Sequence, residues 1–217
     1  MSDSSSSHYN GFDRLILQFD QALRTIVPGS STQHRVSPAD AVDGSNLSDE
    51  ERRQAASLMR INHTGEVCAQ ALYQGQALTA KLPDIRQAME VAAQEEVDHL
   101  AWCEQRLQAL DSHTSVLNPA WYALSFGLGA AAGLAGDNWS LGFVAETESQ
   151  VCDHLRDHLG RLPTQDHKSR AVLEQMLIDE QHHGDTARQA GGSELPAPIK
   201  LGMHLMSQVM KKTAYRF

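Results

Sequence analysis

The sequence is poor in cysteine, in aromatic residues and in positive charge. Its three cysteines, Cys68, Cys103 and Cys152, lie far apart and form no Cys-x-x-Cys pair, so we read them as small core residues of a reducing compartment rather than a disulfide framework. An aromatic content of 6% beside plentiful Ala, Leu, Gln and Glu favours helix over strand. The net charge of −9 argues against nucleic-acid binding, because phosphate contacts need clustered Lys and Arg.

Two further motifs are lacking. The serine-rich residues 1–10 have no basic-plus-apolar run, so we expect a disordered tail over about residues 1–8 and no secretory signal. Gly127 and Gly129 lie in an apolar run without strand context, so they do not form a dinucleotide-binding fingerprint. The sequence therefore predicts no residues that bind an organic cofactor.

Helical periodicity accounts for most of the chain. A short helix is predicted over residues 12–26, followed to residue 48 by a surface linker rich in Pro, Gly and Ser. Ser48 and Glu51 then form a capping-box signature for the first of four long helices. These are predicted over residues 49–80, 84–110, 138–159 and 165–190, and a last amphipathic helix over residues 199–213. We divide the chain into residues 1–48 and one bundle domain over residues 49–217.

The segment between the second and third long helices is different in composition. Residues 112–136 contain no Asp, Glu, Lys or Arg, and residues 119–136 are apolar and rich in glycine. At 18 residues this stretch is near the lower limit for a bilayer span. It either caps the bundle core or forms an apolar surface that dips into a bilayer, and we favour the second interpretation. Lys211 and Lys212 either assist at an anionic leaflet or belong to a helix that only closes the bundle.

Two Glu-x-x-His motifs carry the strongest chemical signal. Residues i and i+3 of a helix share a face, so each motif presents a carboxylate and an imidazole to one site. Ferritin-like di-iron proteins combine two such motifs with one Glu from each of two further helices. Carboxylates with imidazoles suit iron. The candidate metal ligands are Glu66, Glu96, His99, Glu148, Glu180 and His183.

The position of these residues on the apolar faces of their helices supports the set better than the motifs alone. Two matches to Glu-x-x-His are not rare in a chain rich in Glu and His. Glu148 falls within an apolar stripe, whereas Glu146 is rotated from it by about 200°. The other candidates are also bracketed by apolar residues at helical spacing. Four carboxylates in one core are very costly unless cations neutralise them. The rival interpretation is a bundle whose acidic residues line its solvated faces.

Four segments resemble the ligand segments of the demethoxyubiquinone hydroxylase family of ubiquinone biosynthesis. They are Met59-Arg60-Ile61-Asn62-His63-Thr64-Gly65-Glu66 with Tyr73-Gln74-Gly75-Gln76, Glu95-Glu96-Val97-Asp98-His99-Leu100, Val144-Ala145-Glu146-Thr147-Glu148, and Asp179-Glu180-Gln181-His182-His183-Gly184-Asp185-Thr186-Ala187. The resemblance covers about residues 12–217. It implies an all-α, ferritin-like four-helix bundle with additional N-terminal and C-terminal helices and an apolar membrane-facing insert. It also implies that the same six residues hold two irons, with Glu96 and Glu148 as the bridges.

The resemblance further implies a function. Such enzymes are di-iron monooxygenases that use dioxygen to hydroxylate the ring of a polyprenylated methoxy-methyl-benzoquinol, the penultimate step towards ubiquinone. The two electrons needed would come from the quinol, from NADH or from a partner protein. The expected partners are the benzoquinol, a membrane lipid surface and other ubiquinone-biosynthesis proteins, but no nucleic acid. We expect a peripheral membrane protein at the cytoplasmic face of a bacterial inner membrane.

Three rival functions are weighed against this hypothesis. A ferritin-like ferroxidase or iron store would share the ligands but has no use for the uncharged insert. A rubrerythrin-like peroxide reductase would bring a Cys-rich electron domain, and a non-enzymatic helical scaffold would bind no metal. Four other residues are given no catalytic role: His63 is interpreted as a packing residue, and Tyr73 as packing or hydrogen-bonding in the site. His154 and His158 lie one turn apart, which could suit a metal or the outer partners of one, but we interpret them as solvated. No catalytic residue is predicted beyond the metal ligands.

Overall fold

The computed structural model describes residues 11–44 and 46–216, and all regular secondary structure in this part of the chain is helical, with no strand. The helices are α1 (Gly11–Ile26), the 3-10 turn η1 (Pro38–Ala41), α2 (Asp49–Thr79), α3 (Pro83–Ala109), α4 (Asn118–Ala135), α5 (Asp137–Arg161), α6 (His167–Gln189) and α7 (Ala197–Ala214). Every predicted helix is confirmed to within a few residues, and the uncharged segment, for which no helix was predicted, forms α4. The expected tail over residues 1–8 lies outside the described residues.

Local signals explain where the long helices begin and end. The predicted capping box is present at the start of α2, where the Ser48 side chain accepts from the backbone N–H of Glu51 and the Glu51 side chain from that of Ser48. At α6 the Asp166 side chain accepts from the backbone N–H of Ser169. Helix α5 runs on past the predicted stop at Gly160 and ends before Leu162, because a residue that precedes proline disfavours helical geometry.

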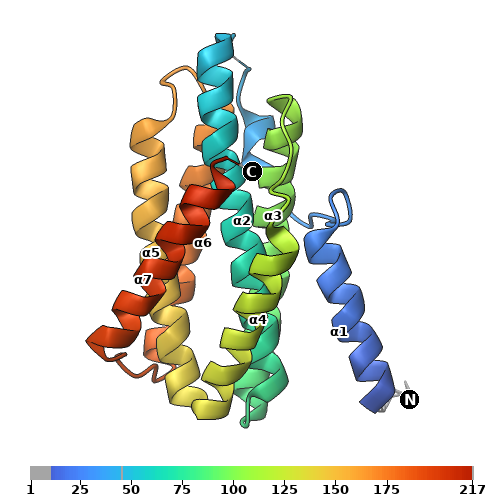
Figure 1. Cartoon of the computed structure of the whole chain (residues 1–217), viewed down its shortest axis with the longest axis vertical. Helices are drawn as coiled ribbons and strands as arrows, with labels where there is room; N and C mark the ends of the chain where they lie inside the picture. The colour runs from blue at the N-terminus through green and yellow to red at the C-terminus, as the bar shows by residue number, and fades with distance from the viewer. Residues whose placement is uncertain (1–10, 45, 217) are drawn as a thin grey trace, which may run out of the picture.

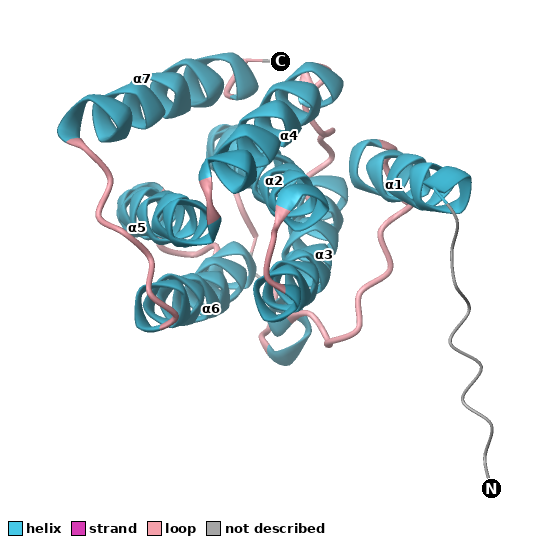
Figure 2. Ribbon diagram, turned by 90° about the horizontal axis from the view of Figure 1, so that it is seen from below, coloured by secondary structure: helices cyan, strands magenta, loops and turns pink. Residues whose placement is uncertain are grey.

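Helices α2, α3, α5 and α6 form the predicted ferritin-like four-helix bundle. The bundle consists of two helical hairpins, α2–α3 and α5–α6 (Figure 1). Helix α4 connects the two hairpins along the chain and runs back beside α2, so α5 starts at the same end of the bundle as α3 (Figure 1). One long crossover of this kind is typical of ferritin-like folds. Figure 2 shows that α4 and α7 cover the face of the bundle opposite α3 and α6, while α1 lies to one side, next to α2 and α3.

Two apolar clusters fill the bundle, one on each side of its middle. One contains Leu58, Trp102, Leu155 and Met176, and the other contains Tyr73, Met89, Val144 and Ala187. On every bundle helix the predicted metal ligands lie between members of these two clusters in sequence. The polar centre of the bundle is therefore closed by apolar side chains at both ends.

Helix α4 is held against α2 by glycine contacts. A Cβ atom added at Gly129 would lie 2.9 Å from Leu72 Cα, and one added at Gly75 would lie 2.8 Å from the backbone nitrogen of Ala130. Only glycine allows two helix backbones to approach so closely. The opposite face of α4 is open, and Leu134 is 67% exposed. The glycine-rich composition thus serves packing on one face and leaves an apolar surface on the other.

We expect Gly129→Ala to destabilise the protein by about 1–3 kcal/mol, because the added methyl group collides with rigid backbone. Gly127, two residues earlier in α4, is the matched control, since its Cβ would have no neighbour within 4 Å. Gly127→Ala should instead stabilise by about 0.5–1 kcal/mol through helix propensity. Urea unfolding of both variants measures the difference, and equal effects would contradict the close packing of α2 and α4.

Within the described residues, no helix has the length and hydropathy that a bilayer span requires. This includes α4, the helix formed by the uncharged segment.

Candidate metal centre

The six predicted ligands are all buried at the middle of the bundle. Helix α2 supplies Glu66 and α5 supplies Glu148, while α3 and α6 each supply one Glu-x-x-His pair. Glu96 and His99 are wholly inaccessible to solvent, and the other four are at most 8% exposed. Four helices thus direct four carboxylates and two imidazoles into one closed volume, as the helical phase predicted.

His99 lies at the centre of the tightest group. Ligand atoms of Glu66, Glu96, His99 and Glu180 all lie within 4.8 Å of one another. His99 Nδ1 is 3.0 Å from a Glu180 oxygen, 3.2 Å from a Glu96 oxygen and 3.6 Å from a Glu66 oxygen. This group can hold a metal ion.

His183 faces the same carboxylates from the other side. Its Nδ1 is 3.1 Å from Glu180 Oε2 and 3.3 Å from Glu96 Oε1, whereas His99 approaches the other oxygen of each carboxylate. Glu96 and Glu180 therefore lie between the two imidazoles. Geometry favours these two as shared ligands, in place of the predicted pair of Glu96 and Glu148.

Each histidine is oriented by an outer carboxylate that sequence reasoning missed. His99 Nε2 donates to Asp179 Oδ2 at 2.8 Å, and His183 Nε2 donates to Glu95 Oε2 at 2.6 Å. A carboxylate can only accept, so Nε2 carries a proton and Nδ1 faces the cluster, where it can bind a metal ion that displaces its proton. A sequence signal was present: an acidic residue directly precedes the Glu of both motifs, and each serves the histidine of the opposite helix.

The electrostatics of the cluster favour a bound cation. Burial, reinforced by the neighbouring carboxylates, raises the pKa of Glu66 and of Glu148 well above the usual range. Burial alone would lower the pKa of His183, but Glu180 and Glu96 outweigh it and raise that pKa to about 12. Burial would likewise raise the pKa of Glu96, but the two imidazoles outweigh it and the pKa falls below its usual range. Protons on Glu66, Glu148 and His183 occupy the place that metal charge would take.

Unsatisfied oxygen atoms give an independent test of fit. Among the described residues, Glu66 Oε2, Glu96 Oε1 and Glu148 Oε2 are buried carboxylate oxygens without a well-formed hydrogen bond. An orphaned buried acceptor costs about 1–3 kcal/mol, and more when it is charged. Three of them around one volume fit a site that metal ions complete.

Comparison with known proteins identifies the family. The sequence model of the family described as "Ubiquinone biosynthesis protein COQ7" matches residues 53–214, which include all six candidate ligands. The chain belongs to this family. It is 63% identical over 213 residues to "3-demethoxyubiquinol 3-hydroxylase" of Pseudomonas fluorescens strain Pf-5, covering 98% of this chain and 99% of the relative. The protein of the same name from Stutzerimonas stutzeri strain A1501 is 63% identical over 212 residues, with the same coverage. The one from Pseudomonas aeruginosa PAO1 is 61% identical over 213 residues, again with the same coverage.

Helix α5 directs Glu148 towards the cluster and Glu146 away from it, as predicted from the helical period. Glu148 is 1% exposed, and its Oε1 accepts a 2.5 Å hydrogen bond from the Tyr73 hydroxyl. Of the two interpretations of Tyr73, hydrogen bonding in the site is therefore confirmed. Glu146 points away from the cluster and lies 3.4 Å from the Lys200 ammonium of α7.

One sequence interpretation was wrong. His154 and His158 are buried rather than solvated, and both donate to the same oxygen of Asn62, at 3.2 and 2.8 Å. Burial lowers the pKa of both imidazoles, to about 3 for His158, so they are neutral packing residues. The α5 sequence could not reveal this, because Asn62 lies on α2 and α7 packs over the same side of α5. His63 is buried as expected, and its Nδ1 accepts from the Asn118 amide at 3.3 Å.

Proposed function

We propose that this chain is a di-iron monooxygenase that hydroxylates the ring of a polyprenylated methoxy-methyl-benzoquinol, demethoxyubiquinol. The observation that carries the proposal is the closed cluster of four Glu and two His in a chain 63% identical to proteins named 3-demethoxyubiquinol 3-hydroxylase. Those relatives favour hydroxylation over the ferroxidase, peroxide-reductase and scaffold alternatives, which none of their names describes.

The residues suit two irons with shared carboxylates. Glu66 with His99 would hold one iron, Glu148 with His183 would hold the other, and Glu96 with Glu180 would be shared. When bound, iron supplies the reductive activation of dioxygen, with one oxygen atom going to the ring and the other to water. The reaction therefore consumes two electrons, from the quinol, a nicotinamide or a partner protein.

The chain's own residues prepare this site in three ways. The two apolar clusters exclude bulk water from the middle of the bundle, which strengthens electrostatic interactions there. Asp179 and Glu95 hold the imidazole rings with Nδ1 facing inwards. Tyr73 donates to Glu148 and so fixes the rotamer of that carboxylate.

An apolar cavity suits a short part of the prenyl tail of the proposed substrate. It has a volume of about 110 Å³ and lies between α2, α4, α5 and α7. Its walls are mostly apolar and include Leu72, Trp121, Phe143, Met203, Met206 and Met210. Methionine is flexible and polarisable, so three methionines from α7 can adapt to an isoprenoid chain.

Peripheral attachment to a bilayer is proposed through the side of the molecule that α4 and α7 cover (Figure 2). Leu201, Leu205 and Val209 are spaced four residues apart on α7 and are exposed, as are Leu124 and Leu134 on α4. Apolar side chains on helices that lie along a surface are typical of interfacial docking.

We expect detergent to release the membrane-bound protein well and high salt to release it poorly. Leu205→Glu changes an exposed side chain and leaves the buried face of α7 intact, so it should shift the folded protein to the soluble fraction. A variant that remains in the membrane pellet like the parent, or a parent that is soluble without detergent, would contradict docking through this surface.

Mass spectrometry of the quinone pool tests the proposed function. A strain that lacks this chain should accumulate the demethoxy quinone and lose ubiquinone. The unaltered gene should restore ubiquinone, and Glu96→Ala should not. A normal quinone pool in the deletion strain, with no second hydroxylase present, would refute the proposal.

A further inference from the structure

The linker between α1 and η1 contacts the outer carboxylates of the candidate metal centre. Arg35 Nε lies 2.8 Å from Asp98 Oδ2 on α3, and Arg35 Nη1 lies 2.9 Å from Asp179 Oδ2 on α6. That same Asp179 oxygen accepts the hydrogen bond from His99 Nε2. One guanidinium thus joins two helices and touches the carboxylate that orients a predicted iron ligand. Arg35 lies outside residues 53–214, the part of the chain that matches the family.

Several contacts fix the linker at this position. The backbone N–H groups of His34 and Arg35 donate to Asp98 Oδ1 at 2.5 and 3.3 Å. Trp102 Nε1 donates to the carbonyl of Arg35 at 3.3 Å, and the guanidinium lies 4.8 Å from the centre of the Trp102 ring. These bonds leave the Arg35 side chain little freedom, although it is 42% exposed.

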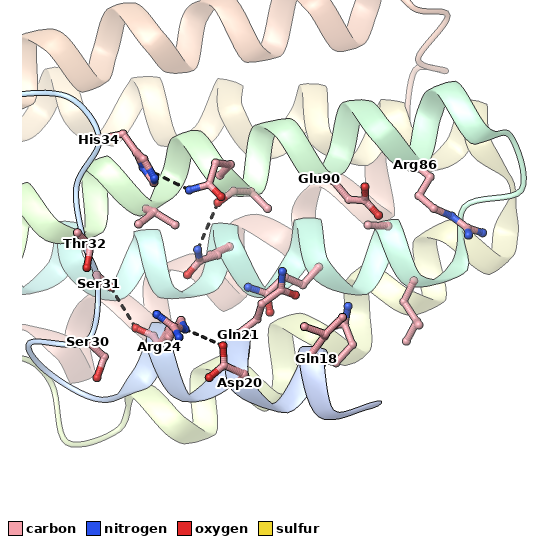
Figure 3. Close-up of a pocket in the computed structure, with 18 residues that line it drawn as sticks. Gln18, Asp20, Gln21, Arg24, Ser30, Ser31, Thr32, His34, Arg86 and Glu90 are labelled. Carbon is pink, nitrogen blue, oxygen red and sulfur yellow. Dashed lines mark hydrogen bonds and ion pairs between the residues drawn. The ribbon is translucent and has the colours of Figure 1, made fainter. Parts of the chain in front are cut away.

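Figure 3 shows how the linker reaches this point. Ser30, Ser31, Thr32 and His34 line one side of a groove of about 810 Å³ between α1, α2 and α3 (Figure 3). His34 Nδ1 is 3.4 Å from Gln94 Nε2, and the Gly29 N–H donates to Glu104 of α3 at 2.5 Å. The linker is therefore bound along α3 before it places Arg35.

The outer carboxylates of His99 and His183 differ in their contacts with basic side chains. Among the described residues, Glu95, the outer partner of His183, forms no ion pair with an arginine or lysine, and its side chain is 49% exposed. The side chain of Asp179 is 16% exposed. Its Oδ2 atom pairs with Arg35, and its Oδ1 atom accepts a hydrogen bond from the Gln175 amide at 2.9 Å. In the described part of the chain, a guanidinium group therefore contacts the outer carboxylate of His99 but not that of His183.

We infer that Arg35 is a positioning residue for the metal centre: it fixes Asp179, and through Asp179 the ring of His99. The inference rests on the proposed di-iron function. A guanidinium has a planar fork that can hold two carboxylates at once, which a lysine ammonium does not reproduce. Outer partners of metal-bound histidines typically contribute 10- to 100-fold to metal affinity. Arg35 should therefore control the iron held by His99 and not the one held by His183.

The test is Arg35→Gln, with Fe²⁺ affinity measured anaerobically by chelator competition on the whole chain. We expect the dissociation constant of one of the two irons to rise about 10-fold, and one of two Mössbauer quadrupole doublets to shift. Arg35→Lys should restore little, because one ammonium does not span Asp98 and Asp179. The matched control is Arg24→Ala, which removes an exposed arginine that forms an ion pair with Asp20 of the same helix, and it should leave both irons unchanged.

A role confined to tethering the linker would give a different result. In that case Arg35→Gln would lower the melting temperature of the metal-free protein and leave both iron affinities unchanged. A double-mutant cycle adds a second criterion: after Asp179→Asn, Arg35→Gln should have little further effect on iron affinity. Additive losses, or equal weakening of both irons, would overturn the inference. If the unaltered chain binds no iron after reconstitution, the proposed function fails, whereas unchanged affinities in an active Arg35→Gln enzyme refute this inference alone.

Discussion

Replacing Glu148 with alanine should abolish hydroxylation and lower the iron content from about two per chain to about one or less. The side chain is buried between α2 and α6, and under the proposed function it belongs to the iron that His183 would hold. Loss of a ligand leaves that iron with too few donors. Elemental analysis after anaerobic reconstitution, and mass spectrometry of the product, measure the two effects.

Glu146 provides the matched control, since it is acidic, lies two residues earlier on α5 and points away from the cluster. Glu146→Ala should keep both irons and full turnover, and loss of the contact with Lys200 should cost about 0.5 kcal/mol or less. Full activity in the Glu148→Ala protein would refute both the ligand assignment and the helical phase of α5.

The stability of the Glu148 variants separates two opposing effects. Removal of a buried ionisable group is stabilising, because burial beside other carboxylates penalises its charged form and raises its pKa. Glu148→Ala, however, also leaves the Tyr73 hydroxyl without its acceptor, which costs about 1–3 kcal/mol. Glu148→Gln keeps an acceptor for Tyr73 and cannot ionise. The metal-free Gln variant should therefore melt at or above the unaltered metal-free protein, and the Ala variant should melt below the Gln variant.

Removing iron from the loaded protein should lower its melting temperature by roughly 10 °C or more. A ligand at about 1,000 times its dissociation constant stabilises the folded state by about 4 kcal/mol, and each kcal/mol shifts a chain of this size by about 2–4 °C. The physical reason is that Glu66, Glu96 and Glu148 retain buried oxygens without hydrogen bonds when no cation is bound. Calorimetry before and after chelation, followed by reloading with Fe²⁺, measures the shift.

In the Glu180→Gln variant, iron removal should lower the melting temperature less than in the unaltered protein. This substitution removes one of the two carboxylates that lie between His99 and His183, so chelation should shift the melting temperature by much less. If chelation leaves the melting temperature of a fully loaded, unaltered protein unchanged, the cluster does not contribute its binding energy to folding.

Signals that act within one helix were reliable in this chain. The capping box of Ser48 and Glu51 was predicted and is present, because both partners lie within four residues. The burial of Glu148 and the exclusion of Glu146 from the core followed from helical phase alone. The interpretation of His154 and His158 as solvated failed, because Asn62 of another helix supplies their acceptor.

The sequence by itself determined every helix except α4, the faces of the bundle helices and the candidate ligands, because a period of 3.6 residues and an i, i+3 spacing are properties of a single helix. Only the tertiary structure decided which carboxylates lie between the two imidazoles and which outer groups orient them. Asp179 reaches His99 across 80 residues of chain, and Arg35 reaches Asp179 across 144. Such pairs have no local pattern, since they depend on how α3, α6 and the linker pack in the folded protein.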